Sequence, residues 1–416
     1  MKAVGFGSRV VGAVSARPVV VRTVLVALGI LGLVFRLAVS ARSHGSNDIN
    51  IWAGFCDKYR EHGGLGWLYD FEPSFNHPPL MGLMAVGLRA VARAWNTGFD
   101  FLFKLPEIAA DVLAAVLVYR TWRPAHAVVA PLAFALFCWN PASILVSAHH
   151  GNTDPMCAAL SLLAAFLVDR RRPFWAGVAL AATINVKLVP VLLIPVFLSC
   201  WPSRRELLRF IGGLSLGVIP FAPIVVGHWS GFRAHVLQYR SYSGPWGVTS
   251  LLEFLAQHRN LVAPAHALST FWTTHAFKLV LLAPLTLAAV NWRRGRPWSA
   301  PELGACAYLM FLILTPGFGV QYVVYPIPLL FAADVRRACG YAAATGLFIL
   351  IVYYATWTGT RPYFSNFYPG FPAGGKVFGH LAWLITIAIT LKLLARPWSA
   401  RRAGPSAPET ELARAR

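Results

Sequence analysis

The segment VRTVLVALGILGLVFRLAVSARSHGSNDINIW (21–52) contains the two features from which the architecture of this chain can be predicted. It begins with an apolar run, Val21–Ser40, that is long enough to cross the hydrocarbon core of a membrane as a helix. A polar stretch follows and places a carboxylate, Asp48, just beyond the end of this run. We therefore expect Asp48 at the water boundary of a membrane, where a lipid-borne molecule and a polar one can meet.

The composition of the whole chain also indicates a membrane protein. Of its 416 residues, 57% are hydrophobic and 13% are charged, and the mean hydropathy is +0.56. A soluble domain usually carries about a quarter charged residues. Apolar runs recur as far as Leu394, and they are continuous rather than alternating, which excludes a β-barrel. The sequence therefore predicts an all-α polytopic membrane protein.

The formal net charge of +21 suggests nucleic acid as one partner, but the distribution of the charges argues against it. Arginine pairs and triplets stand at the ends of apolar runs, as in the cytoplasmic loops of membrane proteins. Their natural partners are the anionic headgroups of the lipid bilayer. The six cysteines are scattered without paired spacing, so we expect neither a disulfide scaffold nor a metal site. The arginine groups are Arg170–Arg172, Arg204–Arg205, Arg293–Arg294, Arg336–Arg337 and Arg401–Arg402.

Placing all these arginines on one side of the membrane predicts about twelve spans with both termini in the cytoplasm. The stretch between Arg172 and Arg204 then holds two short passes that turn near Lys187. We expect a cytoplasmic N-terminus (1–20), one transmembrane domain (21–396) and a disordered tail (397–416). The other expected spans are 105–119, 127–146, 156–168, 209–227, 268–291, 302–315, 320–333, 339–357 and 377–395.

The first outer loop, residues 41–104, is expected to contain two helices that lie on the membrane surface. In Ile49–Arg60, the side chains of Ile49, Trp52, Phe55, Cys56 and Tyr59 share one face, as an interfacial helix requires. Met81–Trp95 carries two arginines, and counting it as a span would invert every later basic cluster. The remaining polar candidates also fall in outer loops, so we expect any chemistry on the outer side.

Two interpretations of Asp48 are open: it is a catalytic base, or it is the N-cap of the helix that follows. Asp154 fits a cap as well, because proline at the next position is typical of a helix start. His149, His150 and Asn152 precede it in a polar loop between two apolar runs, and they can bind phosphate, a sugar hydroxyl or a metal.

Lys187 is the only charged residue between Arg172 and Arg204. A lysine at membrane depth usually faces a polar cavity or a partner, so Lys187 either snorkels from a short pass or contacts a phosphate. Glu107 and Asp111 lie four residues apart at the start of a span, where acidic residues favour a helix N-terminus, and Lys104 can pair with Glu107. Arg361 adds a cation in the last outer loop.

The order of these motifs over residues 20–395 resembles the GT-C superfamily of integral membrane glycosyltransferases. After Asp48, the segment His77-Pro78-Pro79-Leu80 is similar to the Tyr-Pro-Pro-Leu motif of the dolichyl-phosphate-glucose transferases. The loop 149–154 resembles their His-Gly-His-Phe-Gln-Tyr-Asn, and Asn185-Val186-Lys187 resembles their Asn-Tyr-Lys-Gln-Met. The segment 316–322, with Gln321 and Tyr322, looks like that of bacterial polyprenyl-phosphomannose transferases. In this chain, the lysine lacks the following Gln-Met and the histidine loop lacks its aromatic residue.

The resemblance implies an inverting transfer of a hexose, mannose or glucose, from a polyprenyl-phosphate sugar to a lipid-linked or envelope glycan on the extracytoplasmic face. It implies that Asp48 is the general base and that Lys187, with His149, His150 and Arg361, binds the donor phosphate. Neither a cofactor nor a metal is implied. Supporting roles fall to Glu107 and Asp111, and the residues implied for sugar or acceptor binding are His77, Asn152, Asp154, Asn185, Gln321 and Tyr322.

Two other classes stay open from the residues alone. A transporter or lipid flippase also lines its pathway with buried charges, but it predicts functional charges on both faces and internal repeats. Another outer-face transferase, moving an acyl or phospho-group, is compatible with a carboxylate and a histidine that act on a hydroxyl.

Overall fold

The computed structural model of the chain describes residues 18–124, 128–239, 244, 246–256, 262–317, 319–355, 357–358, 363–364 and 373–402. The predicted cytoplasmic N-terminus lies outside these ranges except for its last three residues, and so does Arg361. Of the predicted disordered tail, residues 397–402 continue the last helix, and residues 403–416 lie outside the described part.

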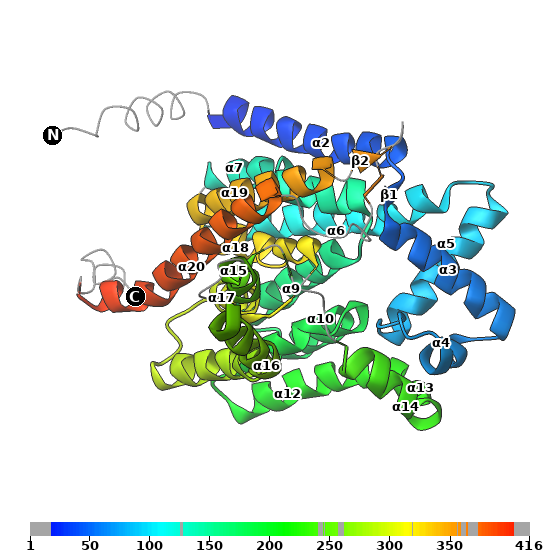
Figure 1. Cartoon of the computed structure of the whole chain (residues 1–416). Helices are drawn as coiled ribbons and strands as arrows, with labels where there is room; N and C mark the ends of the chain where they lie inside the picture. The colour runs from blue at the N-terminus through cyan, green and yellow to red at the C-terminus, as the bar shows by residue number, and fades with distance from the viewer. Residues whose placement is uncertain are drawn as a thin grey trace.

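The first span is a helix, as predicted, and a compact group of helices follows it. α2 (Pro18–Arg42) is followed by a two-residue strand, β1 (Gly45–Ser46), and by α3 (Asn47–His62), α4 (Leu65–Phe71) and α5 (Pro79–Ala94). α3, α4 and α5 lie together on one side of the molecule, beyond the end of α2 (Figure 1). Both helices expected in the first loop are therefore present, with bounds close to the predicted ones.

The central part of the chain forms helices that pack on one another. α6 (Phe99–Trp122) is followed by α7 (Val129–Cys138), α8 (Pro141–Ile144) and a π-helical turn, η1 (Leu145–His150). The expected span 127–146 is thus a broken helix that bends by 42° between α7 and the segment Pro141–His150. α9 (Asp154–Asp169) and α10 (Pro173–Val186) form a hairpin, and α10 ends at Lys187, where a turn between two short passes was expected.

After Lys187 the chain continues through shorter helices to four long ones. The shorter elements are η2 (Val189–Leu192), α11 (Leu193–Leu198), α12 (Arg204–Ser215), η3 (Leu216–Phe221), α13 (Ala222–Gly227), α14 (Trp229–Phe232), η4 (Arg233–Leu237) and α15 (Gly247–Leu255). α16 (Val262–Arg293), α17 (Ala300–Leu314), η6 (Val320–Val324), α18 (Ile327–Ala333), α19 (Val335–Ala355) and α20 (Ala373–Arg402) complete the fold.

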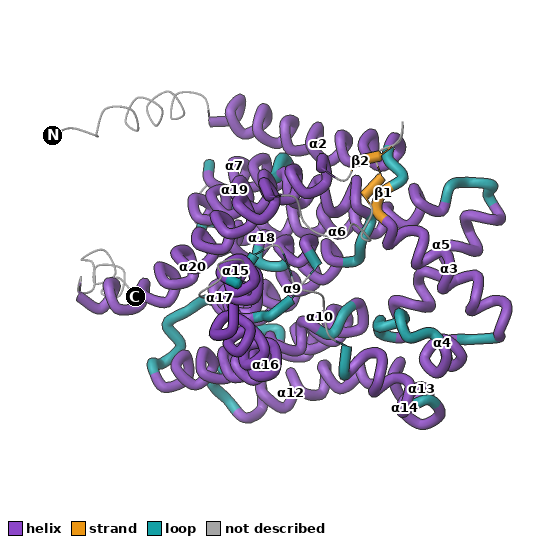
Figure 2. Tube along the Cα trace, in the orientation of Figure 1, coloured by secondary structure: helices purple, strands orange, loops and turns teal. Residues whose placement is uncertain are grey.

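The described part of the chain is mostly helical, with one small sheet beside the start of α3 (Figure 2). The strands β2 (Trp357–Thr358) and β3 (Tyr363–Phe364) join β1 in the order β1-β3-β2. β1 is parallel to β3, and β2 is antiparallel to it. The sheet ties the connection after α19 to the entry of α3, a link that the sequence patterns did not predict.

Within the described residues, five helices are long and apolar enough to cross a membrane, or six if the bent pair counts as one span. They are Val19–Arg42, Arg204–Gly227, Val262–Arg293, Val335–Tyr354 and Gly374–Ala395. This supports a polytopic membrane protein. The number of about twelve spans stays a prediction, since several of the expected passes are helices of only 10–17 residues.

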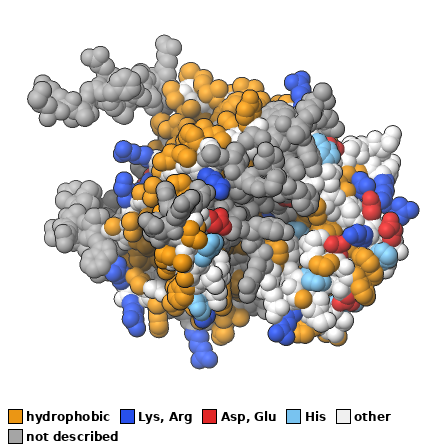
Figure 3. Space-filling view, viewed as in Figure 1, with side chains coloured by type: hydrophobic (Ala, Val, Ile, Leu, Met, Phe, Trp, Pro, Cys, Tyr) orange, Lys and Arg blue, Asp and Glu red, His pale blue; other side chains and the backbone are white. Residues whose placement is uncertain are grey.

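The apolar face of α3 packs on the protein's own core. Ile49, Trp52, Phe55 and Cys56 are all buried, and the ring of Trp52 lies 5.5 Å from that of Phe103 in α6. Charged side chains gather over the part of the surface formed by α3–α5, whereas hydrophobic ones dominate over α2 (Figure 3). The amphipathic pattern thus identified the buried face, and a position of α3 on the membrane surface stays a prediction.

A buried ion pair joins the first span to the centre of the fold. Nε of Arg36 in α2 lies 2.8 Å from Oδ2 of Asp111 in α6, and both side chains are buried. The hydroxyl of Ser143 donates to Oδ1 of Asp111 over 2.7 Å, and the Arg36 guanidinium also donates to the carbonyl of Cys138. Asp111 therefore supports the fold by neutralising Arg36. Arg36 was not among the residues predicted from the sequence.

This arrangement predicts that Arg36→Met destabilises the protein, because it leaves the Asp111 carboxylate buried without its counter-charge. We expect a loss of roughly 3–5 kcal/mol in the free energy of unfolding, measured by thermal or chemical denaturation in detergent. The double variant Arg36→Met/Asp111→Asn should recover most of the lost free energy of unfolding. Arg22→Met, on the exposed side of the same helix, is the control. Equal losses for Arg22→Met and Arg36→Met would contradict a structural role of the pair.

Candidate active site

Asp48 lies in the first turn of α3, but it does not cap the helix. The N-cap is Ser46, whose hydroxyl accepts a hydrogen bond from the backbone N–H of Asp48 over 3.1 Å. The interpretation of Asp48 as an N-cap is therefore wrong, and its carboxylate is available for other contacts. Serine occupies the cap because its short hydroxyl reaches back to the helix N–H groups from extended backbone.

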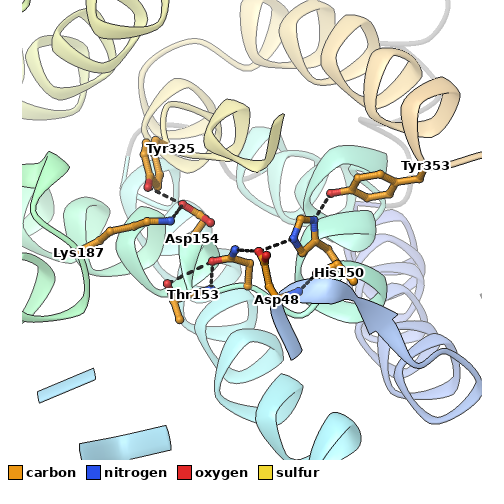
Figure 4. Close-up of polar contacts among 9 residues, drawn as sticks. Asp48, His150, Thr153, Asp154, Lys187, Tyr325 and Tyr353 are labelled. Carbon is orange, nitrogen blue, oxygen red and sulfur yellow. Dashed lines mark hydrogen bonds and ion pairs between the residues drawn. The ribbon is translucent and has the colours of Figure 1, made fainter. Parts of the chain in front are cut away.

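The carboxylate of Asp48 faces the turn that follows η1 (Figure 4). Nε2 of His150 lies 2.9 Å from Oδ2 of Asp48, and the side-chain amide of Asn152 donates to the same oxygen. The other ring nitrogen of His150, Nδ1, lies 2.5 Å from the hydroxyl of Tyr353 in α19. With the Tyr353 hydroxyl donating to Nδ1, Nε2 carries the hydrogen that His150 donates to Asp48. Tyr353, His150 and Asp48 form a chain of hydrogen bonds that fixes the carboxylate of Asp48.

Two glycines permit this close approach of segments that are distant in the sequence. Gly151 ends η1 with φ +72°, and a Cβ atom there would lie 2.6 Å from Cδ1 of Ile49. Gly45 has φ +107°, and a Cβ atom on it would lie 2.9 Å from the carbonyl oxygen of His150. Both positions combine a left-handed backbone with a tight contact, so each needs a glycine. The π-helical turn before Gly151 rotates the His150 ring towards Asp48, and such turns are frequent at functional sites.

The electrostatic surroundings keep Asp48 ionised. Burial by itself raises the pKa of the carboxyl, but the hydrogen bond from His150, the positive charge of Lys187 and the amide of Asn152 outweigh it. The pKa of Asp48 is therefore below its usual value of 3.8. At neutral pH the side chain is a carboxylate whose oxygens can accept a proton.

A second group of polar side chains lies beside the first one and centres on Asp154 (Figure 4). Nζ of Lys187 lies 2.9 Å from Oδ1 of Asp154, and the hydroxyl of Tyr325 donates to the same oxygen. Lys187 also lies over the ring of Tyr322, with Nζ 4.5 Å from the centroid. Lys187 therefore faces a polar partner instead of snorkelling, and 12% of its side chain is exposed.

Asp154, like Asp48, was a candidate N-cap that the structure assigns differently. The N-cap of α9 is Thr153, while Asp154 and Pro155 are the first two helical residues. The Asp154 side chain is directed at Lys187 and Tyr325, and its Oδ2 has no hydrogen-bond partner among the described residues. Its contacts thus serve the polar cluster instead of the helix end.

His77 stands between these two groups and the aromatic core of the first loop. Its ring lies 4.2 Å from that of Trp52, and the charges of both Lys187 and Asp48 act on it. Burial, helped by the positive charge of Lys187, lowers the pKa of His77 to about 3. The ring is therefore neutral at physiological pH, and its Nδ1 has no hydrogen-bond partner among the described residues.

Several predicted site residues lie elsewhere or contribute indirectly. Asn185 donates to the carbonyls of Ala181 and Gly217, each over 2.9 Å, and so holds α10 against η3. Glu107 is fully buried beside Asp154 and the backbone N–H of Met156. Lys104 donates to the carbonyl of Ser43 over 2.7 Å instead of forming the proposed ion pair with Glu107.

His149 borders the first polar group, whereas Gln321 lies in η6. The ring of His149 lies 5.5 Å from that of Tyr353, so it lines the site from beside His150. Gln321 belongs to η6, directly before Tyr322, and among the described residues its side chain forms no hydrogen bond with either polar group. In the ranges that the structure describes, no group of three or more His, Cys, Asp or Glu side chains is arranged to hold a metal.

Tyr325 and Tyr353 belong to the two polar groups, but they were not among the site residues predicted from the sequence. Tyr353 is a buried tyrosine at the end of a membrane helix, and Tyr325 is buried next to Tyr322. A buried tyrosine usually needs a partner for its hydroxyl, and this is the signal that could have identified both.

Fold and site together define a polytopic membrane protein with a fixed carboxylate and a lysine in one polar cluster beside its membrane helices. Residues 75–316, more than half of the chain, match the model of glycosyltransferase family 87. The chain belongs to this family of GT-C-like membrane glycosyltransferases. A search of curated proteins found no match. The matched segment includes His77, His150, Asn152, Asp154 and Lys187, whereas Asp48 precedes it.

Proposed function

We propose that this glycosyltransferase moves a hexose, mannose or glucose, from a polyprenyl-phosphate sugar to a lipid-linked or envelope glycan acceptor, with inversion at the anomeric carbon. The observation that carries the proposal is the position of Asp48 and Lys187 in one cluster. A base and a cation are the two groups that such a transfer needs.

Asp48 is the general base of the proposed reaction. The acceptor hydroxyl attacks the anomeric carbon, its proton passes to the Asp48 carboxylate, and the bond from this carbon to the phosphate oxygen breaks. Because attack comes from the face opposite the leaving group, the configuration inverts. The hydrogen bonds from His150 and Asn152 hold the carboxylate in one orientation, and Tyr353 holds His150.

Lys187 stabilises the leaving polyprenyl phosphate. The phosphate is a weak base, so it needs a positive charge near its oxygens more than a proton. Asp154 and Tyr325 fix the ammonium group, and the partial exposure of Lys187 leaves room for a second anionic partner. His150 was expected to bind the phosphate, but both its ring nitrogens already have partners, so we assign it a positioning role at Asp48.

The site is proposed to face the extracytoplasmic side of the inner membrane. The α9–α10 hairpin supports this orientation, because Asp154 and Lys187 lie at one end of it and the arginine triplet 170–172 lies at the other. Under the positive-inside rule, the arginine end is cytoplasmic. His77, Asn152 and Tyr322, which lie around Asp48 and Lys187, are the residues that we propose to contact the sugar or the acceptor.

Asp48→Asn should abolish transfer because an amide cannot accept the proton. Membranes that contain the full chain are supplied with radiolabelled polyprenyl-phosphate mannose or glucose, and we expect label in the glycan fraction to fall by about 100-fold or more. Asp57→Asn is the matched control: Asp57 is in the same helix, but its carboxylate pairs with Arg89 at the surface over 3.1 Å. The base assignment would be wrong if Asp48→Asn transferred as well as Asp57→Asn.

His150→Gln should move the acid limb of the pH–activity profile to higher pH. Asp48 must be deprotonated to act, and in the wild type its lowered pKa keeps it ionised into the acidic range. Removing the hydrogen bond from His150 lets burial raise that pKa, so the variant loses its carboxylate, and with it activity, at a higher pH than the wild type. His62→Gln, at the exposed end of α3, should leave the profile unchanged. An unshifted limb in His150→Gln would exclude this coupling.

Lys187→Met should weaken binding of the donor. Loss of a charged hydrogen bond to phosphate corresponds to a donor KM raised by about 10- to 100-fold. Because Lys187→Met leaves Asp154 buried without its counter-charge, the double variant Lys187→Met/Asp154→Asn removes both charges together. If the phosphate role is correct, the double variant regains thermal stability but keeps the raised KM. A normal donor KM in a folded double variant would refute it.

A further inference from the structure

A groove at the far end of the α9–α10 hairpin has no role in the proposed transfer. It has a volume of about 330 Å³ and is lined by Arg171, Arg172, Pro173, Phe174, Trp175 and Arg209. α9 has 16 residues, so its two ends lie about 24 Å apart, somewhat less than the roughly 30 Å hydrocarbon core of a bilayer. Asp154 marks one end, and the groove adjoins the other.

The polar groups of the groove are cationic. Three guanidinium groups line it, and Arg172 and Arg209 form no ion pair with any residue that the structure describes. Arg171 donates to the carbonyl of Cys200 over 3.2 Å, which fixes its side chain at the rim. The carboxylate that acts on Arg171 is Asp169, which accepts a hydrogen bond from the backbone N–H of Ala300 over 3.0 Å. The groove therefore keeps a net positive charge.

The backbone at Arg171 is strained. Arg171 has φ +55°, a left-handed conformation that glycine usually occupies after a helix. The N–H of Arg172 bonds to the carbonyl of Leu167 over 2.9 Å and closes the helix end. An arginine at this strained position indicates a use for its side chain there, because glycine would relieve the strain.

Aromatic side chains form the other wall. The side chain of Trp175 is 60% exposed and that of Phe174 is 39% exposed, and the two rings meet edge to face at 5.4 Å. Exposed tryptophan beside arginine at the end of apolar helices is typical of the boundary between headgroups and acyl chains. A ligand that fits has an anionic oxygen group joined to a hydrocarbon chain.

We propose that this groove binds the phosphodiester headgroup of an anionic phospholipid, in the leaflet opposite the one that the Asp48 cluster faces. The guanidinium groups of Arg172 and Arg209 pair with the phosphate oxygens, for which their planar donor pairs are well suited. The acyl chains lie along Phe174 and Trp175. Lipid binding at this groove requires no substrate of the transferase, so its test is independent of the test of the proposed reaction.

The test uses the full chain purified in an uncharged detergent, with native mass spectrometry to count bound lipid. The probes are dioleoyl phosphatidylglycerol and, as the zwitterionic comparison, dioleoyl phosphatidylcholine. We expect the wild type to retain the first in preference to the second. In Arg172→Gln/Arg209→Gln the affinity for phosphatidylglycerol should fall by about tenfold or more.

Arg204→Gln/Arg205→Gln is the matched control, because it removes the same charge from α12 outside the groove. This variant should bind phosphatidylglycerol within about twofold of the wild type. Equal losses in the two double variants, or equal retention of both lipids, would overturn the proposal in favour of non-specific attraction. Competition by glycerophosphoglycerol, which lacks acyl chains, would overturn it in favour of a soluble phosphodiester.

Discussion

The contact between Asp48 and the turn at His150–Asn152 is the interaction on which the candidate site depends. It joins the first turn of α3 to a loop that lies about a hundred residues later, and it exists only because both backbones come unusually close. Gly45 and Gly151 make that approach possible, and Lys104 holds the end of α2 beside them through the carbonyl of Ser43. A carboxylate at the edge of a membrane protein would otherwise be solvated and mobile. Here it has one orientation, which a base that must meet a single hydroxyl requires.

The two carboxylates of the site have different surroundings, and this difference separates their proposed roles. Asp48 accepts hydrogen bonds from His150 and Asn152, and 16% of its side chain is exposed. Asp154 is fully buried and paired with the ammonium of Lys187, which leaves it unsuited to receive a proton from a substrate. Its use is to fix the cation. Arg36 and Asp111 repeat the same principle deeper in the fold, where a buried charge is tolerated because its counter-ion is held by further hydrogen bonds.

The sequence predicted the helices well and the contacts of their polar ends poorly. Apolar runs set the positions of α2, α9 and α10, and the amphipathic pattern of α3 identified the face that is buried. Both aspartates, however, looked like helix caps, and the caps proved to be Ser46 and Thr153. Local rules favour either residue at a cap, and only the tertiary structure shows that each carboxylate has a stronger partner. The Tyr353–His150 contact spans two hundred residues of sequence, so no local pattern contains it. Arg36 was recognisable from sequence as a charge within an apolar span.

The α9–α10 hairpin relates the proposed chemistry to the position of the protein in the membrane. A reaction on a lipid phosphate takes place at a defined depth, because the prenyl chain holds the phosphate at the headgroup level of one leaflet. Lys187 can meet that phosphate only if the helix that carries it is fixed at the matching depth. α9 and α10 are packed together, and α9 is about 24 Å long. An arginine groove that binds a phospholipid at one end of this rigid hairpin would therefore hold Asp154 and Lys187, at its other end, level with the opposite headgroup layer. In this arrangement, the charged ends of one helix pair determine both where the protein sits and where its donor phosphate is met.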